Sequence, residues 1–181
     1  MPLHRFPFRA MAADNEVQIH AHDENEARGA AERAIAEVRR IEAKYSRYLP
    51  GSLLSRINAA AGGAPVEVDA ETQALLDYAD ACWRQSGGLF DPTSGVLRRA
   101  WDFGLARVPT TAQLEPLLAR IGWERVERDD GRVRLAAAGM ELDFGGFGKE
   151  YAVDRAAAEL HAVGVTSALV NLAGDLAVLG P

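Results

Sequence analysis

The sequence predicts an α+β fold in which an antiparallel sheet packs against paired helices. The expected strands arrive in pairs separated by pairs of helices, whereas a parallel α/β sheet requires strict alternation of strand and helix. Asp129-Asp130-Gly131 also separates two short runs of alternating character, which is a typical hairpin turn. With 181 residues the chain is long enough to bury a core, so we expect one domain over residues 1–181.

The first expected elements are two strands and a long helix. Leu3–Arg9 and the alternating segment Glu16–Ala21 are expected to form two strands of one hairpin or sheet edge. Between Glu24 and Tyr45, apolar residues recur at steps of three and four, which predicts an amphipathic helix. Asp23 or Glu24 stands at its start, where an anion stabilises a helix N-terminus.

The middle of the chain is expected to be mainly helical. A short helix is expected over Leu53–Ala60, and Val66–Val68 is a brief strand. Asp69 then caps a second long helix that ends at Gly87-Gly88, because glycine commonly follows a helix C-terminus. A third helix is expected over Thr111–Ile121.

The last part of the chain alternates strands with one helix. The hairpin strands are expected at Arg125–Glu127 and Arg132–Leu135, followed by a strand over Met140–Phe144. A helix is expected over Lys149–Val163, and the last clear strand is Thr166–Val170.

Composition excludes several classes of protein. The chain carries 26 acidic and 20 basic side chains, a net charge of −6, which disfavours nucleic acid as a partner. The single cysteine, Cys82, cannot form an internal disulfide, and no Cys/His cluster has zinc-site spacing. No apolar run reaches the roughly 20 residues of a membrane span, and the start lacks the features of a signal peptide, so a cytoplasmic location is expected.

The segment Leu142–Tyr151 carries the strongest chemical signal. An expected strand enters the turn Gly145-Gly146-Phe147-Gly148, which opens a helix, so backbone N–H groups could approach a phosphate. Lys149 adds a full positive charge, and Asp143 could bind a sugar or base edge. The segment fits neither the Walker A loop nor G-x-G-x-x-G. A purely structural turn with a solvated Lys149 remains the alternative.

Three further segments are candidates for a ligand site. In Gly87–Gly95, Asp91 is followed by proline and serves either a ligand or the next helix as its cap. The aromatic rings of Tyr45–Pro50 could stack on a planar ligand or pack half-buried. Asn171–Asp175 is either a bulge or a loop facing a ligand. No serine or cysteine has a recognisable nucleophile setting, so a covalent hydrolase has little support.

Taken together, four blocks resemble, in the same order, the motifs of the FAD:protein FMN transferase (ApbE) family. The blocks are Tyr45–Tyr48 with Ser52–Asn58 (S-x-Y … S-x-L-S-x-I-N), Gly88–Thr93 with Trp101–Gly104 (G-x-F-D-x-T … W-x-F-G), Leu142–Asp154 (D-L-G-G-x-x-K-G-Y-x-x-D) and Val170–Asp175 (V-N-x-G-G-D).

The resemblance implies a T-fold-like α+β core and a transferase that uses FAD as substrate and Mg²⁺ as cofactor. Such an enzyme transfers the FMN half of FAD to a threonine of an acceptor protein and releases AMP. By matching positions, the resemblance implies FAD contacts for Met11, Tyr48, Leu89, Phe90, Asp91, Asp143 and Lys149. It also implies that the carbonyl of Gly146 is a metal ligand.

The chain departs from the family pattern at four positions and in length. Met11-Ala12-Ala13 replaces Met-Gly-Thr, Glu150 replaces a glycine, and Ala173 replaces the first glycine of Gly-Gly-Asp. The family's C-terminal portion, with an Asp and a Thr or Ser of the metal site, is lacking. We therefore expect an incomplete fold that holds one side of the active site, with an open sheet edge that favours a homo-oligomer. FAD hydrolysis to FMN and AMP, or a non-catalytic flavin-binding scaffold, are the alternative functions.

Overall fold

The computed structural model describes residues 1–101, 104 and 107–180, and the chain forms two compact units. Unit 1 combines Met1–Ser46 with Gly145–Pro181, and unit 2 is the segment Arg47–Phe144 between them. The block Trp101–Gly104, which carries part of the resemblance, lies partly outside the described residues. The single flavin-transferase-like domain expected over residues 1–181 stays a prediction.

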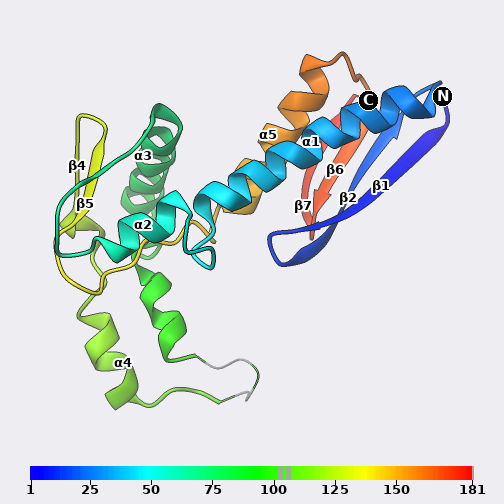
Figure 1. The fold of residues 1–181 in the computed structure, drawn as a ribbon. Helices are drawn as coiled ribbons and strands as arrows, with labels where there is room; N and C mark the ends of the chain where they lie inside the picture. Colours follow the sequence, from blue (N-terminus) through cyan, green and yellow to red (C-terminus); the bar gives the residue numbers. More distant parts are fainter. Residues whose placement is uncertain (102–103, 105–106, 181) are drawn as a thin grey trace. The chain divides into compact units, whose positions relative to one another are not determined.

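Unit 1 is a four-stranded antiparallel sheet with two helices on one face (Figure 1). The strand order is β1-β2-β6-β7, so β1 and β7 are the two edges. The elements are β1 (Leu3–Ala10), β2 (Ala13–His20), α1 (Glu24–Tyr45), α5 (Gly148–Ala162), β6 (Ala168–Leu172) and β7 (Asp175–Leu179). Helix α1 packs on β1 and β2, whereas α5 packs on β6, β7 and α1.

The core of unit 1 lies between the sheet and these helices. Val17, Ile19 and Val170 point to the helix side and are fully or almost fully buried. Helix α1 approaches the sheet closely because most of its buried residues are alanines. Its N-terminus is capped by Asp23, whose side chain accepts hydrogen bonds from the backbone N–H groups of residues 25 and 26.

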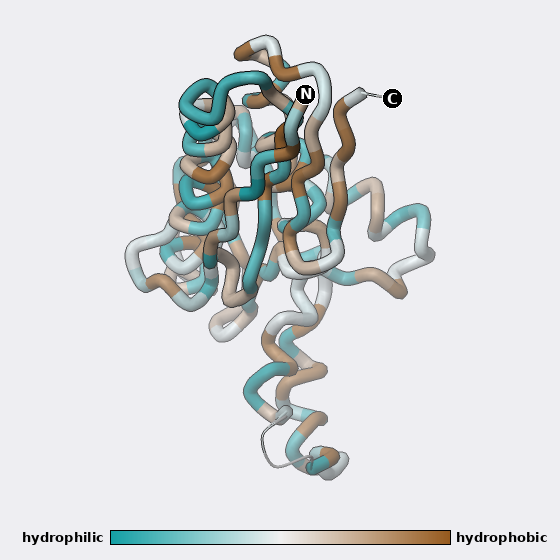
Figure 2. Tube along the Cα trace, turned by 90° about the vertical axis from the view of Figure 1, so that its right-hand side faces the viewer, coloured by the Kyte–Doolittle hydropathy of each residue, from teal (hydrophilic) through white to brown (hydrophobic). Residues whose placement is uncertain are grey.

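The opposite face of the sheet is apolar near the β7 edge. Leu176 and Val178 are exposed, and their register partners Asn171 and Leu169 lie beside them on β6. The apolar colour extends over most of β7 (Figure 2). A homo-oligomer formed through this surface stays a prediction.

Unit 2 contains a small antiparallel sheet of order β3-β5-β4 and several short helices. Its elements are α2 (Leu53–Ala59), β3 (Val66–Glu67), α3 (Ala70–Gln85), the 3₁₀ helix η1 (Ser94–Arg99), α4 (Thr111–Leu118), the 3₁₀ helix η2 (Trp123–Arg125), β4 (Val126–Asp129) and β5 (Arg132–Leu135). Asp69 caps α3 through the N–H of Thr72, and Asp130-Gly131 forms the two-residue turn between β4 and β5 with positive φ at both positions.

The α+β prediction with antiparallel pairing is confirmed, since every strand pair of the described sheets is antiparallel. The helix over Glu24–Tyr45 is confirmed at both ends, and the first hairpin is confirmed. Helix α4 ends at Leu118 instead of Ile121, and the last helix begins at Gly148 and ends at Ala162.

Two predictions about the second half were wrong. Met140–Phe144 is not a strand, because Leu142 pairs through both backbone groups with the side-chain amide of Asn58 and no neighbouring strand. Thr166–Val170 is also not the last strand: β6 continues to Leu172, and β7 follows after a two-residue turn at Ala173-Gly174. Asn171–Asp175 is therefore a tight hairpin and not a bulge.

Candidate functional site

The extended segment 140–144 of unit 2 is held firmly although it belongs to no sheet. The Asn58 side chain accepts from the Leu142 N–H (2.7 Å) and donates to the Leu142 carbonyl (2.9 Å). The N–H of Asp143 donates to the carbonyl of Pro92 at 2.9 Å. These contacts fix the backbone from which Asp143 projects.

A second anchor of this segment is the buried carboxylate of Glu141. It forms ion pairs with Arg98 at 3.2 Å and with Arg99, both from η1. Because two guanidinium groups face one carboxylate, the buried charge of Glu141 is fully compensated. Sequence reasoning missed this cluster, since nothing in the local pattern relates η1 to residue 141.

Asp143 forms a close ion pair with Arg47, which also contacts Tyr48. One terminal nitrogen of Arg47 donates to the Asp143 carboxylate, and the other donates to the Tyr48 hydroxyl at 2.9 Å. The guanidinium carbon lies 5.0 Å from the centre of the Tyr48 ring, which is cation–π distance. Two predicted site residues far apart in the sequence, Tyr48 and Asp143, are thus brought together by Arg47.

Gly95 lies against this ion pair. A Cβ atom at this position would stand 2.5 Å from the Cβ of Asp143 and 3.3 Å from Nη1 of Arg47. Only glycine therefore allows η1 to approach the pair this closely. The family block Gly88–Thr93 ends two residues before this glycine, so the motif gives no sign of the contact between Gly95 and Asp143.

Asp91 organises the turn before η1. Its Oδ1 accepts from the N–H (2.7 Å) and the hydroxyl (2.6 Å) of Thr93, and its Oδ2 accepts from the Trp123 N–H at 3.1 Å. The Thr93 hydroxyl in turn accepts from the N–H of Gly122 at 2.8 Å. A carboxylate has about four acceptor positions, so among the described residues three of them are used and one on Oδ2 remains for a ligand.

The neighbours of Asp91 differ in exposure. Leu89 is 93% exposed and Phe90 is half-buried, with its N–H donating to the Ser86 hydroxyl at 2.9 Å. Because the apolar side chain of Leu89 is so exposed, it is accessible to a ligand. Tyr48 is similarly accessible at 70%.

The predicted phosphate-binding residues lie in unit 1, at the start of α5. Gly146 is exposed in the turn, Phe147 is the N-cap residue without a side-chain cap, and Lys149 is half-buried in the first turn of the helix. Within the part of the chain that the structure describes, Lys149 forms no ion pair. Backbone N–H groups, the positive end of the helix dipole and an ammonium group thus coincide.

Met11 lies in the two-residue turn of the first hairpin in unit 1. Met11 and Ala12 both have positive φ, 52° and 59°, which non-glycine residues seldom adopt. The turn is held by the Glu42 carboxylate, which accepts from the Met11 N–H at 2.6 Å, and by the buried Asn15 amide, which donates to the carbonyls that flank the turn.

The predicted residues are therefore divided between the units. Met11, Gly146 and Lys149 belong to unit 1; Tyr48, Leu89, Phe90, Asp91 and Asp143 belong to unit 2. Within unit 2, Pro92 connects the Asp91 turn to Asp143 through its carbonyl.

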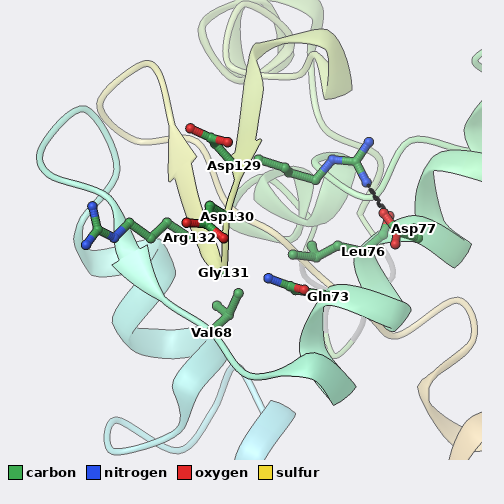
Figure 3. A pocket seen from close by; sticks show the side chains of 9 residues that line it. Val68, Gln73, Leu76, Asp77, Asp129, Asp130, Gly131 and Arg132 are labelled. Atoms are coloured by element: carbon green, nitrogen blue, oxygen red, sulfur yellow. Dashed lines mark hydrogen bonds and ion pairs between the residues drawn. The ribbon is translucent and has the colours of Figure 1, made fainter.

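Two surface pockets lie away from all the predicted residues. One in unit 2, of about 230 Å³, is formed by the β4–β5 turn and α3, with Gln73 and Asp130 among its lining residues (Figure 3). Arg128 reaches Asp77 across its rim at 2.9 Å. The other, of about 670 Å³, lies in unit 1 between the start of α1 and the loop after α5.

Among the carboxyl groups of the described residues, those of Asp80 and Glu37 have lowered pKa values. The indole N–H of Trp123, at 2.8 Å, is the main cause of the lowered pKa of Asp80, with Arg128 and Arg84 contributing. In unit 1 the hydrogen bond from Arg40 is the main cause of the lowered pKa of Glu37.

The described residues offer little for a metal ion. They contain no group of three or more His, Cys, Asp or Glu side chains arranged to hold one. The predicted ligand, the Gly146 carbonyl, is a single neutral oxygen, whereas Mg²⁺ takes about six oxygen ligands in an octahedron. These residues by themselves do not fit a magnesium site.

None of the helices in the described part of the chain is both long and apolar enough to cross a bilayer. The expected cytoplasmic location stays a prediction.

Comparison with known proteins gives a consistent result. The model of the ApbE family matches residues 11–181. The FAD:protein FMN transferase of Treponema pallidum is 35% identical over 164 residues, which are 86% of this chain and 45% of the relative. The FAD:protein FMN transferase of Rhodobacter capsulatus is 31% identical over 170 residues, which are 91% of this chain and 32% of the relative.

Solved structures agree over nearly the whole chain. The ApbE protein of Thermotoga maritima superposes with a TM-score of 0.88 at 30% identity, and the flavinyl transferase ApbE of Pseudomonas stutzeri with 0.86 at 26%. Both superpositions cover 99% of this chain, but only 60% and 58% of those chains. The chain thus spans less than two thirds of the length of these relatives.

Proposed function

The chain belongs to the ApbE family, and from that premise we propose that it acts as an FAD:protein FMN transferase. Its substrates would be FAD and a threonine hydroxyl on an acceptor protein, and its products the flavinylated protein and AMP. The match of the family model across residues 11–181 carries this proposal, because that range contains every residue assigned to FAD.

The proposed reaction is a displacement at phosphorus. The threonine oxygen forms a bond to the phosphorus of the FMN half, the bond from that phosphorus to the bridging oxygen breaks, and AMP leaves with the bridging oxygen. The hydroxyl proton is released. Such a transfer depends mainly on positioning and on stabilisation of negative charge.

The residues of this chain are suited to holding FAD. Lys149 and the start of α5 would bind the diphosphate, since they combine a full positive charge with the backbone N–H groups of a helix N-terminus. Tyr48 would stack on a ring of FAD, and Asp143 would accept a hydrogen bond from it. Leu89, Phe90 and the remaining acceptor position of Asp91 would contact the adenosine part, and Met11 would line the flavin pocket.

We also propose Mg²⁺ as the metal, with the Gly146 carbonyl as one ligand. When bound, the metal would neutralise charge on the diphosphate. The described residues contain no cluster of three or more carboxylate, histidine or cysteine side chains that would complete the site, so we assign no step to the metal.

The alternatives share the FAD site and differ in the acceptor. With water in place of threonine, the same displacement yields free FMN and AMP; without turnover, the protein is a flavin-binding scaffold. Incubation with FAD, Mg²⁺ and a threonine-containing acceptor peptide separates these functions. We expect covalent flavin on the peptide by mass spectrometry and AMP in equal amount by chromatography.

Two variants sharpen this assay. Tyr48→Phe retains the ring and should keep most of the FAD affinity, whereas Tyr48→Ala should lose it. Arg132→Ala, an exposed arginine of β5 that stands 3.7 Å from Glu67, is the matched control and should change nothing. Free FMN without modified peptide would show that the protein hydrolyses FAD and does not transfer FMN. Bound FAD without release of AMP would show that the protein is a flavin-binding scaffold.

A further inference from the structure

We infer that Arg47 is a positioning residue that fixes Tyr48 and Asp143 in one arrangement for FAD. This inference rests on the proposed function. Arg47 occupies the open middle position of the S-x-Y motif, where the family pattern requires no particular residue. The motif by itself therefore assigns no role to Arg47.

The two terminal nitrogens of Arg47 hold the two residues simultaneously. Nη1 donates to the Asp143 carboxylate, and Nη2 donates to the Tyr48 hydroxyl at 2.9 Å. A planar guanidinium with donors on a fixed fork can make both bonds in one geometry. Because Asp143 is itself fixed by the backbone bond to Pro92, the orientation of Tyr48 becomes tied to a rigid part of unit 2.

Arg47 orients the Tyr48 side chain through two contacts, the hydrogen bond to the hydroxyl and the cation–π contact with the ring, and the second contact persists in Tyr48→Phe. The Tyr48 side chain is 70% exposed, and exposed side chains change rotamer freely. With the guanidinium 5.0 Å from the ring centre, the ring is held before any ligand arrives. Fixing a side chain beforehand removes the loss of conformational entropy that binding would otherwise incur.

Arg47 also adjusts the charge that FAD meets. The side chains of Arg47 and Asp143 are only 19% and 24% exposed, so the pair is partly desolvated and weakly screened. Paired, the two groups are neutral overall. Without Arg47, Asp143 would lose this compensating charge, and its carboxylate would disfavour an anionic ligand such as FAD.

Three variants test the inference. For each, the FAD affinity is measured by titration with flavin fluorescence as the signal, and the midpoint of thermal unfolding is measured alongside. Arg47→Met removes the charge and both donors but keeps an unbranched chain, and should weaken FAD binding about 10- to 100-fold. Arg47→Lys keeps one charge without the fork and should fall between Arg47→Met and the unsubstituted chain. Arg132→Met, the exposed control, should bind FAD with unchanged affinity.

The double variant Arg47→Met/Asp143→Asn separates positioning from simple packing. If Arg47 acts through Asp143, removing Arg47 in the Asp143→Asn background should cost only a few-fold in affinity. An equal loss in both backgrounds would overturn the inference, as would a lower unfolding midpoint with unchanged FAD affinity. If the unsubstituted chain binds no FAD, both the proposed function and the positioning role of Arg47 are refuted. If Arg47→Met binds FAD with unchanged affinity, only the positioning role is refuted.

Discussion

Replacing Gly95 by alanine should disturb the position of Asp143 and lower both stability and FAD affinity. The new methyl carbon would stand 2.5 Å from the Cβ of Asp143, at least 1 Å short of the roughly 3.5–4.0 Å of ordinary carbon–carbon contact. Asp143 cannot turn away by a rotamer change because its Cβ is attached to the backbone. That backbone is tied to Asn58 through Leu142 and to Pro92.

The expected destabilisation follows from overpacking. Inserting a methyl group into a closely packed site costs about 1–3 kcal/mol, against which alanine regains roughly 0.5–1 kcal/mol relative to glycine through reduced freedom of the unfolded chain. We expect Gly95→Ala to lose about 1–2 kcal/mol of unfolding free energy, measured by urea denaturation.

Gly29→Ala is the matched control, because it is the same chemical change with the opposite expected sign. Gly29 lies inside α1, and no heavy atom lies within 4 Å of its Cβ position apart from its chain neighbours and the backbone of its own helix. Alanine there should add about 0.5–1 kcal/mol of stability through helix propensity. If Gly95→Ala proved as harmless as Gly29→Ala and bound FAD normally, the close approach of η1 to Asp143 would be refuted.

Three other predictions concern different parts of the chain. Ala12→Gly and Ala173→Gly should each stabilise the protein by about 0.5–1 kcal/mol in urea titrations, because both alanines have left-handed backbone (φ 59° and 55°); a loss of stability would contradict the strain. Asp80 has a lowered pKa, so its charged form stabilises the fold above its unfolded pKa and this contribution disappears as the pH falls through the folded value. In urea denaturation, Asp80→Asn should thus lower the free energy of unfolding more at pH 7 than at pH 3. An equal loss at the two pH values would contradict a stabilising role of the charged carboxylate. Lys149→Ala should weaken FAD binding about 10- to 100-fold in a fluorescence titration, whereas unchanged affinity would favour a purely structural turn.

The helices and their ends could be predicted because the signals are local. Apolar spacing located α1, and the capping aspartates Asp23 and Asp69 both accept the N–H groups expected of them. The turn at Asp130-Gly131 was equally readable, because both residue types tolerate positive φ.

The structure differs from prediction where a partner lies far away in the sequence. Met140–Phe144 alternates like a strand, but its partner is the amide of Asn58, which no local pattern reveals. The Met11-Ala12 turn carries no turn residue and is held instead by Asn15 and Glu42.

In the candidate site, too, motif residues could be identified from the sequence but long-range contacts could not. The resemblance identified Tyr48 and Asp143, and in the structure both accept a hydrogen bond from Arg47. Arg47 and Gly95 themselves could not be assigned, since their importance arises from contacts and not from residue type. The FAD contacts of all these residues stay predictions.

The insertion of unit 2 into unit 1 sets an order for folding during synthesis. Unit 2 is one continuous stretch whose strand pairs β3–β5 and β4–β5 are complete when residue 135 has emerged. In the sheet of unit 1, β2 pairs with β6, for example Glu16 with Asn171. This pairing cannot form until the whole of unit 2 has been translated. Closing a loop that already contains a folded segment loses less chain entropy than closing the same length of unfolded chain. Early folding of residues 47–144 would therefore speed completion of the outer sheet and shorten the time for which the β2 edge is open to other chains.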